Sequence, residues 1–488
     1  MHDRLAAIRR VIDQGPYTDD WASLARYETP AWYQNLKFGI FIHWGVFSVP
    51  AFANEWYSRN MYVQGSPEYE HHIATYGPHR DFGYKDFIPL FRAERFDPEA
   101  WAELFARARA RYVMPVAEHH DGFQMYRSAL SHWNAYEMGP RRDVLGEIHS
   151  ACRSRGLVCG ASSHRVEHYW FMGMGKRFDS DIRDPVPRDS LYWPSVTEPE
   201  PFDMQSIDPE GLTPSEEFLE DWLLRTCELI DRYRPRILYF DWWIQHKAVR
   251  PWLQKLAAYY YNQAAARGET VVINYKHDAF PFGCAVPDVE RGQFADMKPY
   301  FWQTDTAIAY NSWCWTEGNS FKPAEDLVRD LVDIVSKNGT FLLNVGPKPD
   351  GTISDPDRAV LEAIGDWMAA NGEAIRDTRP WKIYGEGPTR FREGHFTDGE
   401  RKGFTHQDVR YTRKGDCLYA VALAPSPDGV YTFPALGTDS PHFRGVIRET
   451  VCLDTDAPVA VARDGEGLHL RIPVRDGAMP VAFRIRVG

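Results

Sequence analysis

The stretch Pro235-Arg236-Ile237-Leu238-Tyr239-Phe240-Asp241-Trp242-Trp243-Ile244 decides the fold class of this 488-residue chain. Residues 237–240 form a short run of β-branched and aromatic side chains, which predicts a strand buried on both faces. A helical pattern over residues 214–234 precedes the run and ends at Pro235, because proline cannot continue a helix. Asp241 follows the strand directly. In a parallel α/β barrel, ligands bind at the carboxyl ends of the strands, so Asp241 is a candidate functional residue.

A single aspartate after a strand is more often a helix cap or an ion-pair partner than a reactive group. The functional interpretation gains weight only because other strand ends in this chain carry similar residues. Strand and helix patterns alternate through the first three quarters of the sequence, which predicts a (β/α)8 barrel. The predicted strands lie at 36–43, 112–117, 157–162, 237–240, 270–275, 285–290, 302–306 and 340–345.

The sixth and seventh of these strands, at 285–290 and 302–306, have the weakest patterns. Predicted helices lie at 97–110, 143–155, 214–234, 251–267, 323–337 and 355–370. The helix at 323–337 ends at Asn338-Gly339, a typical C-cap signal. A flavodoxin-like sheet would need only five or six strands, and the chain is too long for it. The polar, proline-rich stretch 177–214 is expected to be a loop.

The pattern changes near residues 378–381. From residue 410 onward, short alternating runs are separated by turn residues, which predicts an antiparallel β-sandwich of about 100 residues. The runs are 410–413, 418–423, 451–453, 468–474 and 481–487. We therefore expect a catalytic (β/α)8-like barrel over residues 1–378 and a C-terminal β-sandwich domain over residues 379–488.

Composition narrows the class of protein. The formal charge of −12 argues against nucleic acid or an anionic membrane as the main partner. The seven cysteines form no CxxC pair, which favours reduced, buried thiols over a disulfide framework. The N-terminus has no apolar signal segment, and no run of 18 apolar residues occurs. These features predict a cytoplasmic protein, and they leave a homo-oligomer open.

The residues at the predicted strand ends share a chemistry. Histidines, carboxylates and tryptophans would meet at one barrel mouth, where imidazole and carboxylate groups suit hydroxyls and indole rings suit the apolar face of a sugar. Asp241 and a glutamate would supply the nucleophile and the acid/base for glycoside cleavage. The collected residues are His43, Glu55-Trp56, His119-His120-Asp121, His164, Glu167-His168, Asp241-Trp242-Trp243, Glu290-Arg291, Trp302-Gln303 and Trp313–Glu317.

Two alternatives stay open. His119-His120-Asp121 could belong to the metal site of an amidohydrolase-like barrel, but adjacent strand residues point to opposite faces, so a metal is not expected. A non-catalytic sugar-binding barrel is the other alternative, and it requires one carboxylate to be misplaced. The chain has no P-loop and no GxGxxG after a strand, so we expect no cofactor.

Several longer motifs resemble those of the α-L-fucosidases of glycoside hydrolase family 29. The resemblance covers roughly residues 30–425. The motifs are Phe38-Gly39-Ile40-Phe41-Ile42-His43-Trp44-Gly45, Asn54-Glu55-Trp56-Tyr57, His119-His120-Asp121-Gly122-Phe123, Ser131-His132-Trp133-Asn134, Ser336-Lys337-Asn338-Gly339, Leu342-Leu343-Asn344-Val345-Gly346-Pro347, Asn371-Gly372-Glu373-Ala374-Ile375 and Thr378-Arg379-Pro380-Trp381.

The resemblance implies a retaining exo-hydrolase that releases terminal α-L-fucosyl residues from oligosaccharides or glycoconjugates. By position, Asp241 matches the family nucleophile after the fourth strand. Trp243 or Trp315 would contact the 6-methyl group of fucose, and Arg291 falls where family members place an arginine on the sugar. The residues that match those holding the fucose hydroxyls are His43, Glu55, Trp56, His119 and His120.

The sequence departs from the family pattern at two places. Many members carry the general acid/base in a Trp-Glu pair, which reads Trp302-Gln303 here, and glutamine cannot deliver a proton. The acid/base varies in position across this family, and we take Glu290 as the predicted acid/base here, with Glu55 and Glu317 as reserves. The second departure is Ser163-His164, where the family often has a tyrosine; His164 is the candidate substrate-binding residue there.

Overall fold

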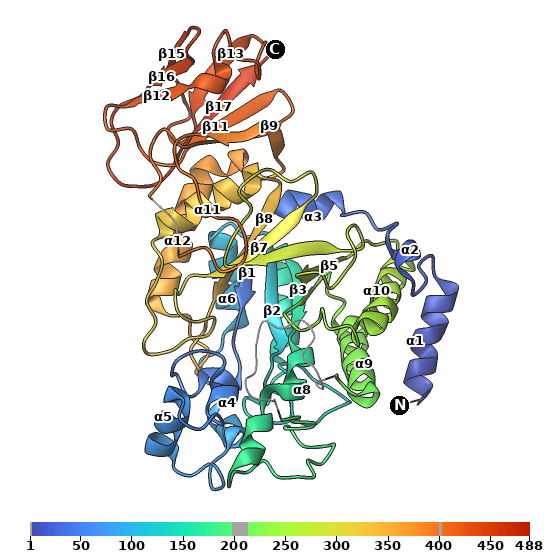
Figure 1. Cartoon of the computed structure of the whole chain (residues 1–488). Coiled ribbons are helices and arrows are strands. Elements are labelled where there is room, and N and C mark those ends of the chain that lie inside the picture. Colours follow the sequence, from blue (N-terminus) through green and yellow to red (C-terminus); the bar gives the residue numbers. More distant parts are fainter. Residues whose placement is uncertain (1, 198–212, 400–402) are drawn as a thin grey trace.

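The computed structural model describes residues 2–197, 213–399 and 403–488. Eight parallel strands close into a barrel in chain order, and β8 pairs with β1 (Figure 1). These strands are β1 (Phe38–Ile42), β2 (Tyr112–Glu118), β3 (Val158–Ser163), β4 (Ile237–Phe240), β5 (Val272–Lys276), β6 (Val286–Glu290), β7 (Trp302–Ala307) and β8 (Gly339–Val345). The predicted barrel, including its two weakest strands, is confirmed.

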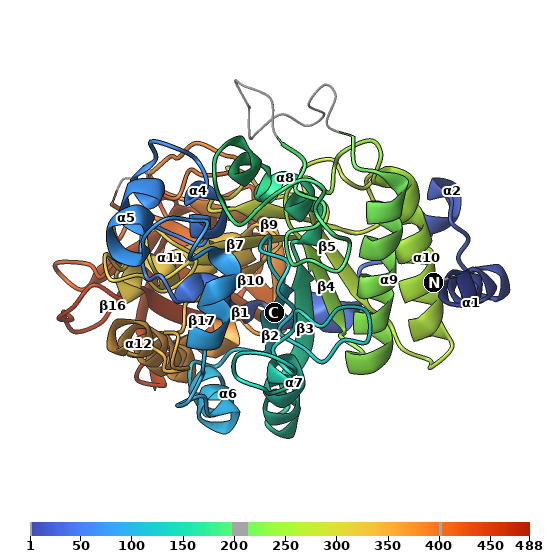
Figure 2. The same cartoon turned by 90° about the horizontal axis from the view of Figure 1, so that it is seen from below.

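Helices surround the barrel, as the view from below shows (Figure 2). The outer helices are α6 (Pro98–Arg107), α7 (Val144–Ser154), α9 (Glu216–Tyr233), α10 (Arg250–Ala265), α11 (Ala324–Ser336) and α12 (Asp355–Asn371). The N-terminal helix α1 (His2–Gln14) packs outside α9 and α10. The remaining helices are α2 (Trp21–Leu24), α3 (Ala31–Leu36), α4 (Tyr57–Asn60), α5 (Pro67–Tyr76) and α8 (His168–Phe171), with 3-10 turns at Val46–Ser48, Tyr84–Leu90, Arg165–Glu167, Gly173–Arg177, Gly372–Ala374 and Pro434–Leu436.

The end of α11 differs in one detail from the sequence expectation. Asn338 adopts the left-handed conformation, with φ of 74°, whereas Gly339 already belongs to β8. Asparagine tolerates this conformation better than most side chains. The stop signal was therefore correct, but the asparagine and not the glycine makes the turn.

Polar side chains inside the barrel explain why β6 and β7 give weak strand patterns. Lys276 lies at the centre of this group, with its Nζ 2.6 Å from Asp288 and 3.0 Å from Asp305. Gln303 donates to Asp288 at 2.7 Å, and the Tyr239 hydroxyl donates to Asp305 at 2.7 Å. All five side chains are buried. Because every one of them has a partner, the interior tolerates residues that would otherwise argue against a buried strand.

Two antiparallel sheets follow the barrel and sit beside α11 and α12 (Figure 1). The larger has the order β14-β13-β17-β11-β10-β9 and the smaller β12-β16-β15. Four of these strands, β9, β12, β14 and β15, were not foreseen. The strands are β9 (Arg379–Glu386), β10 (Val409–Lys414), β11 (Cys417–Ala422), β12 (Val430–Phe433), β13 (Ile447–Cys452), β14 (Ala457–Pro458), β15 (Ala460–Arg463), β16 (Leu468–Arg471) and β17 (Val481–Val487).

A buried ionic group joins the barrel to these sheets. Asp333 on α11 accepts from Arg410 of β10 at 2.5 Å and from Lys337 at 2.7 Å. We expect Asp333→Ala to lower the free energy of unfolding by about 3–5 kcal/mol, because it leaves two cations without a counter-charge in a buried site. Urea denaturation measures this loss. Asp326→Ala, at an exposed position of the same helix, is the matched control and should change stability by less than about 0.5 kcal/mol.

Other expectations concern the thiols and the polar insert. All seven cysteines are free, and six of them are buried, as predicted; Cys417 is partly exposed. Within the insert at 177–214, the described positions 178–197 and 213–214 form no helix or strand, while positions 198–212 lie outside the described residues. Among the helices that the structure describes, none is both long and apolar enough to cross a membrane.

Candidate active site

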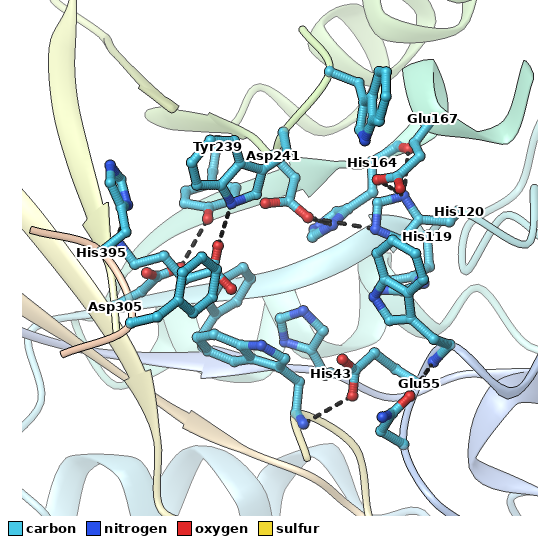
Figure 3. Close-up of a pocket in the computed structure, with 18 of the residues that line it drawn as sticks. His43, Glu55, His119, His120, His164, Glu167, Tyr239, Asp241, Asp305 and His395 are labelled. Carbon is cyan, nitrogen blue, oxygen red and sulfur yellow. Dashed lines mark hydrogen bonds and ion pairs between the residues drawn. The ribbon is translucent and has the colours of Figure 1, made fainter. Parts of the chain in front are cut away.

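A cavity of about 770 Å³ opens where the strands of the barrel end (Figure 3). Strands β1 to β6 each contribute a residue at or just after their carboxyl end, and β7 contributes Asp305, two positions before its last residue. One further segment, at 392–396, comes from the chain after β9. The lining residues are Phe41, His43, Asn54, Glu55, Trp56, Asn60, His119, His120, His164, Glu167, Tyr239, Asp241, Trp242, Trp243, His277, Glu290, Asp305, Trp313, Arg392, His395 and Phe396.

Asp241 occupies the centre of this cavity, directly after β4. His164 Nδ1 lies 2.9 Å from its Oδ2, and His120 Nε2 lies 3.4 Å from the same oxygen. Burial alone would raise the pKa of Asp241. The contacts with His164 and His120 outweigh burial and hold that pKa well below its usual value. Asp241 is therefore ionised, with both histidine contacts on one of its two oxygens.

His120 is the charged partner of this carboxylate. Its Nδ1 lies 3.2 Å from Glu167, while its Nε2 faces Asp241. Burial opposes the charged form, but the two carboxylates prevail and raise the pKa of His120 to about 9. The imidazolium thus sits between two acids in a buried site, where an unpaired charge would be costly.

His43 and His119 are neutral, because burial lowers the pKa of each well below its usual value. Asn344 fixes the tautomer of His43. The Asn344 amide group donates to the Trp313 carbonyl, so its Oδ1 is the acceptor for His43 Nδ1 at 2.7 Å. The other ring nitrogen of His43, Nε2, is consequently a hydrogen-bond acceptor. A ligand hydroxyl can donate to it.

His164 uses both of its ring nitrogens within the protein. Nδ1 contacts Asp241, and Nε2 lies 2.8 Å from the Ser162 hydroxyl. Its role is therefore to position Asp241 rather than to bind a hydroxyl directly. Among the residues that the structure describes, two triads have atoms close enough to hold a metal ion, and both need His164. They are His43-His119-His164 and His120-His164-Asp241. The hydrogen bonds of His164 fit such a ligand poorly.

Glu290 is the last residue of β6 and lines the same cavity. Its Oε2 accepts from the Trp242 indole at 2.5 Å and lies 3.4 Å from Lys276 Nζ. Burial, aided by the negative charge of Asp241, raises the pKa of Glu290 against the opposing effect of Lys276. Asp241 and Glu290 thus have pKa values shifted in opposite directions. Burial also raises the pKa of Asp305 in this cavity, but both of its oxygens are held, Oδ1 by Lys276 and Oδ2 by the Tyr239 hydroxyl.

The reserve candidates for the acid/base are placed less favourably. Glu55 lines the cavity, but its Oε2 accepts from the Trp313 backbone at 2.9 Å and from Ser312 at 3.2 Å, so it holds a loop in place. Glu317 is exposed and lies outside the cavity lining. Gln303, at the family's Trp-Glu position, is buried in the barrel interior, where it bonds to Asp288.

Nine of the eleven predicted site residues line the cavity, and Arg291 and Trp315 do not. The Arg291 guanidinium points to the carbonyls of Tyr310 and Ser312 and stacks on Trp313, 4.6 Å from its ring centre. Arg291 therefore holds Trp313 in place without lining the cavity itself. Trp315 lies beside Lys348, two positions beyond Trp313, which is the tryptophan that faces the cavity.

The sequence interpretation missed four lining residues of note. His277 directly follows β5, so the strand-end argument would have found it if it had been applied to every strand. Asp305 lies inside β7, two positions before its last residue, where it pairs with Lys276. His395 and Phe396 belong to the chain after β9, and no local pattern signals their return to the barrel mouth. Figure 3 places His395 and Asp305 on the opposite side of Asp241 from His120 and Glu167.

The family model for α-L-fucosidases matches residues 5–373 of this sequence. The chain belongs to the α-L-fucosidase family. Among relatives of this family member, human tissue α-L-fucosidase is 30% identical and covers 98% of this chain and 92% of its own length. Bovine tissue α-L-fucosidase is 29% identical, over 97% and 91% respectively.

Solved structures agree with this family assignment. The structure of Thermotoga maritima α-fucosidase in complex with fucose is 28% identical, with a TM-score of 0.73. The match covers 96% of this chain and 100% of that one. The family member described here thus shares both parts of its architecture, the closed barrel and the C-terminal sheets, with an α-fucosidase over nearly its whole length.

Proposed function

We propose that this protein is a retaining, exo-acting α-L-fucosidase that hydrolyses terminal α-L-fucosyl residues of glycans. The observation that carries the proposal is the pair of carboxylates in one cavity, with the pKa of Asp241 lowered and that of Glu290 raised. Such a divergence assigns the two roles of a retaining glycosidase, because the nucleophile must be ionised and the acid must hold a proton.

In the first step, Asp241 attacks C1 of the fucosyl unit. Its Oδ1 is the attacking oxygen, since His164 and His120 hold Oδ2. The C1–O bond to the leaving group breaks as the new ester bond forms, and Glu290 gives its proton to the departing oxygen. In the second step, water attacks C1, Glu290 takes a proton from that water, and the Asp241 carboxylate is released.

The histidines at the closed end of the cavity suit the hydroxyls of a single terminal sugar. Neutral His43 accepts a hydrogen bond from one sugar hydroxyl through Nε2. The charged His120 keeps Asp241 ionised until Asp241 forms its bond to C1. Buried side chains close this end of the cavity, which favours cleavage at the chain end over cleavage within a glycan.

The activity should follow a bell-shaped pH profile with a broad plateau. Asp241 must be deprotonated, and its lowered pKa moves the acidic limb of kcat/KM below the ordinary carboxyl range. Glu290 must be protonated, and its raised pKa moves the alkaline limb upward. In Glu290→Gln the acidic limb from Asp241 should remain. On the alkaline side the Glu290 limb should disappear, which leaves only a limb near pH 9 from His120. An unchanged alkaline limb in this variant would contradict the assignment.

The test of the proposed function is turnover of a chromogenic α-L-fucoside, with proton NMR of the first fucose released. Retention predicts that the α-anomer appears first, because two successive displacements at C1 restore the original configuration. Release of the β-anomer would contradict the double-displacement mechanism. Binding of fucose without turnover would favour a sugar-binding barrel, and inactivation by a chelator would favour a metal-dependent hydrolase.

A further inference from the structure

The loop at residues 391–398 leaves the C-terminal sheets and returns to the barrel mouth. Its backbone pairs with the segment that follows β6: the Phe396 N–H donates to the Glu290 carbonyl at 2.9 Å, and the Thr397 N–H donates to the Arg291 carbonyl at 2.8 Å. A second pairing joins Gln293 to Gly394. These main-chain bonds tie the loop to the strand end that carries the proposed acid/base.

Two further features keep this loop in place. Asp398 accepts from Lys322 at 2.5 Å and from Thr306 at 2.8 Å, which anchors the far end of the loop to β7 and to the chain that follows it. The backbone also approaches very closely at Gly292, where a Cβ would lie 1.9 Å from the Gly394 carbonyl oxygen. The loop is therefore a fixed part of the cavity wall rather than a separate surface segment.

The loop stands on the leaving-group side of the cavity. In a retaining glycosidase the acid/base lies beside the departing oxygen, and the nucleophile lies across C1 from it. Glu290 contacts this side three times: its N–H donates to His395 Nδ1 at 2.9 Å, its carbonyl accepts from Phe396, and its carboxylate accepts from Trp242. A group that departs from C1 toward Glu290 therefore leaves past His395, Phe396 and Trp242.

Exposure separates the two ends of the cavity. The histidines around Asp241 are 1–4% exposed, whereas Phe396 is 50% exposed although its ring borders the cavity. Trp242 lies nearly parallel to Phe396, with ring centres 6.2 Å apart and an angle of 18° between the planes. The closed end is thus polar, and the open end is aromatic. We call the surface formed by Trp242 and Phe396 the aromatic ledge.

His395 adds a polar group to this ledge. Because its Nδ1 accepts the Glu290 N–H, the proton of the neutral ring is on Nε2, which can donate. Burial lowers the pKa of His395 to about 3, in agreement with a neutral ring. One aromatic face with one donor beside it is the combination that recognises a pyranose, through its C–H face and a hydroxyl.

We propose that the loop at residues 391–398 builds the subsite for the sugar that leaves, with Phe396 as the stacking surface. The inference rests on the proposed fucosidase function and adds to it a leaving group of defined class, a pyranose bound by its apolar face. Residues of the loop at 391–398 would then contact the leaving sugar, while residues at the ends of the barrel strands contact fucose.

The test compares two substrates in the full-length protein. In α-L-fucosyl fluoride the leaving fluoride makes no contact with the ledge, whereas a fucosyl disaccharide places a pyranose on it. We use whichever of the 1→2, 1→3, 1→4 and 1→6 disaccharides is cleaved fastest. Phe396→Ala should lower kcat/KM for the disaccharide by about tenfold more than for the fluoride, as the loss of one aromatic contact predicts. Phe396→Trp should keep most of the disaccharide rate.

Phe282→Ala is the matched control, because Phe282 is 70% exposed and lies outside the cavity lining; it should change neither rate. Equal losses on both substrates in Phe396→Ala would overturn the inference and leave the fucosidase function standing. A disaccharide-specific loss that Phe396→Trp does not restore would also overturn it. A wild-type protein inactive on both substrates would instead refute the proposed function.

Discussion

Asp241→Ala should lower the hydrolysis of an aryl α-L-fucoside by at least about 10⁴-fold, the scale on which the loss of a catalytic nucleophile is measured. The change removes the oxygen that forms the bond to C1. The change removes little buried surface, because the Asp241 side chain is small and 15% exposed, so the variant is expected to fold. The measurement is kcat/KM with an activated aryl substrate, alongside thermal unfolding to verify that the variant folds.

Azide distinguishes a lost nucleophile from a disturbed site. The space left by the Asp241 carboxylate admits a small anion on the same face of C1, beside the charged His120. Turnover should return with azide, and the product should be β-L-fucosyl azide, because a single displacement inverts the anomeric centre. Asp416→Ala, at an exposed position between β10 and β11, is the control and should retain full activity without azide. Failure of azide to restore turnover in a folded variant would count against Asp241 as the nucleophile.

Glu290→Gln should separate substrates by the quality of their leaving groups. For a fucosyl disaccharide, kcat/KM should fall by about 10³-fold, because the departing oxygen needs a proton. For a dinitrophenyl fucoside the fall should be less than about tenfold, since that leaving group departs as a stable anion. Glutamine preserves the size of the side chain and an oxygen that can accept from Trp242.

The reserve glutamates provide the contrast for this experiment. Glu317→Gln should leave both rates unchanged, because Glu317 is exposed and away from the cavity. Glu55→Gln should lower both rates by a similar factor, since Glu55 positions the backbone of Trp313. If Glu55→Gln rather than Glu290→Gln gave the leaving-group dependence, the acid/base would have to be reassigned.

Much of the barrel could be predicted because its strands and helices follow local rules. The apolar run at 237–240 coincides with β4, and Asp241 follows it as expected. The polar strands β6 and β7 were the hard cases, since Asp288, Gln303 and Asp305 are buried through a shared network with Lys276 that no single window of sequence reveals.

The site residues that follow a barrel strand could be predicted from the sequence. Those that reach the site through contacts between distant parts of the chain could not. His43, His119 and His120 were identified because each follows a barrel strand. The different roles of these histidines could not be predicted, because each role depends on a contact made only in the folded chain. These contacts are His43 with Asn344, His164 with Ser162, and His120 with Glu167. His395 and Phe396 escaped for a similar reason, since they lie more than 100 residues from the strand end they contact.

The backbone pairing between Gly394 and Gln293 also limits how this protein can be divided. Excision of everything after Thr378 would not yield a minimal enzyme, because the shortened barrel would lack one side of its own mouth. Transplanting residues 387–399 between homologues offers the converse opportunity, a way to graft new glycan preferences onto an unaltered fucose pocket.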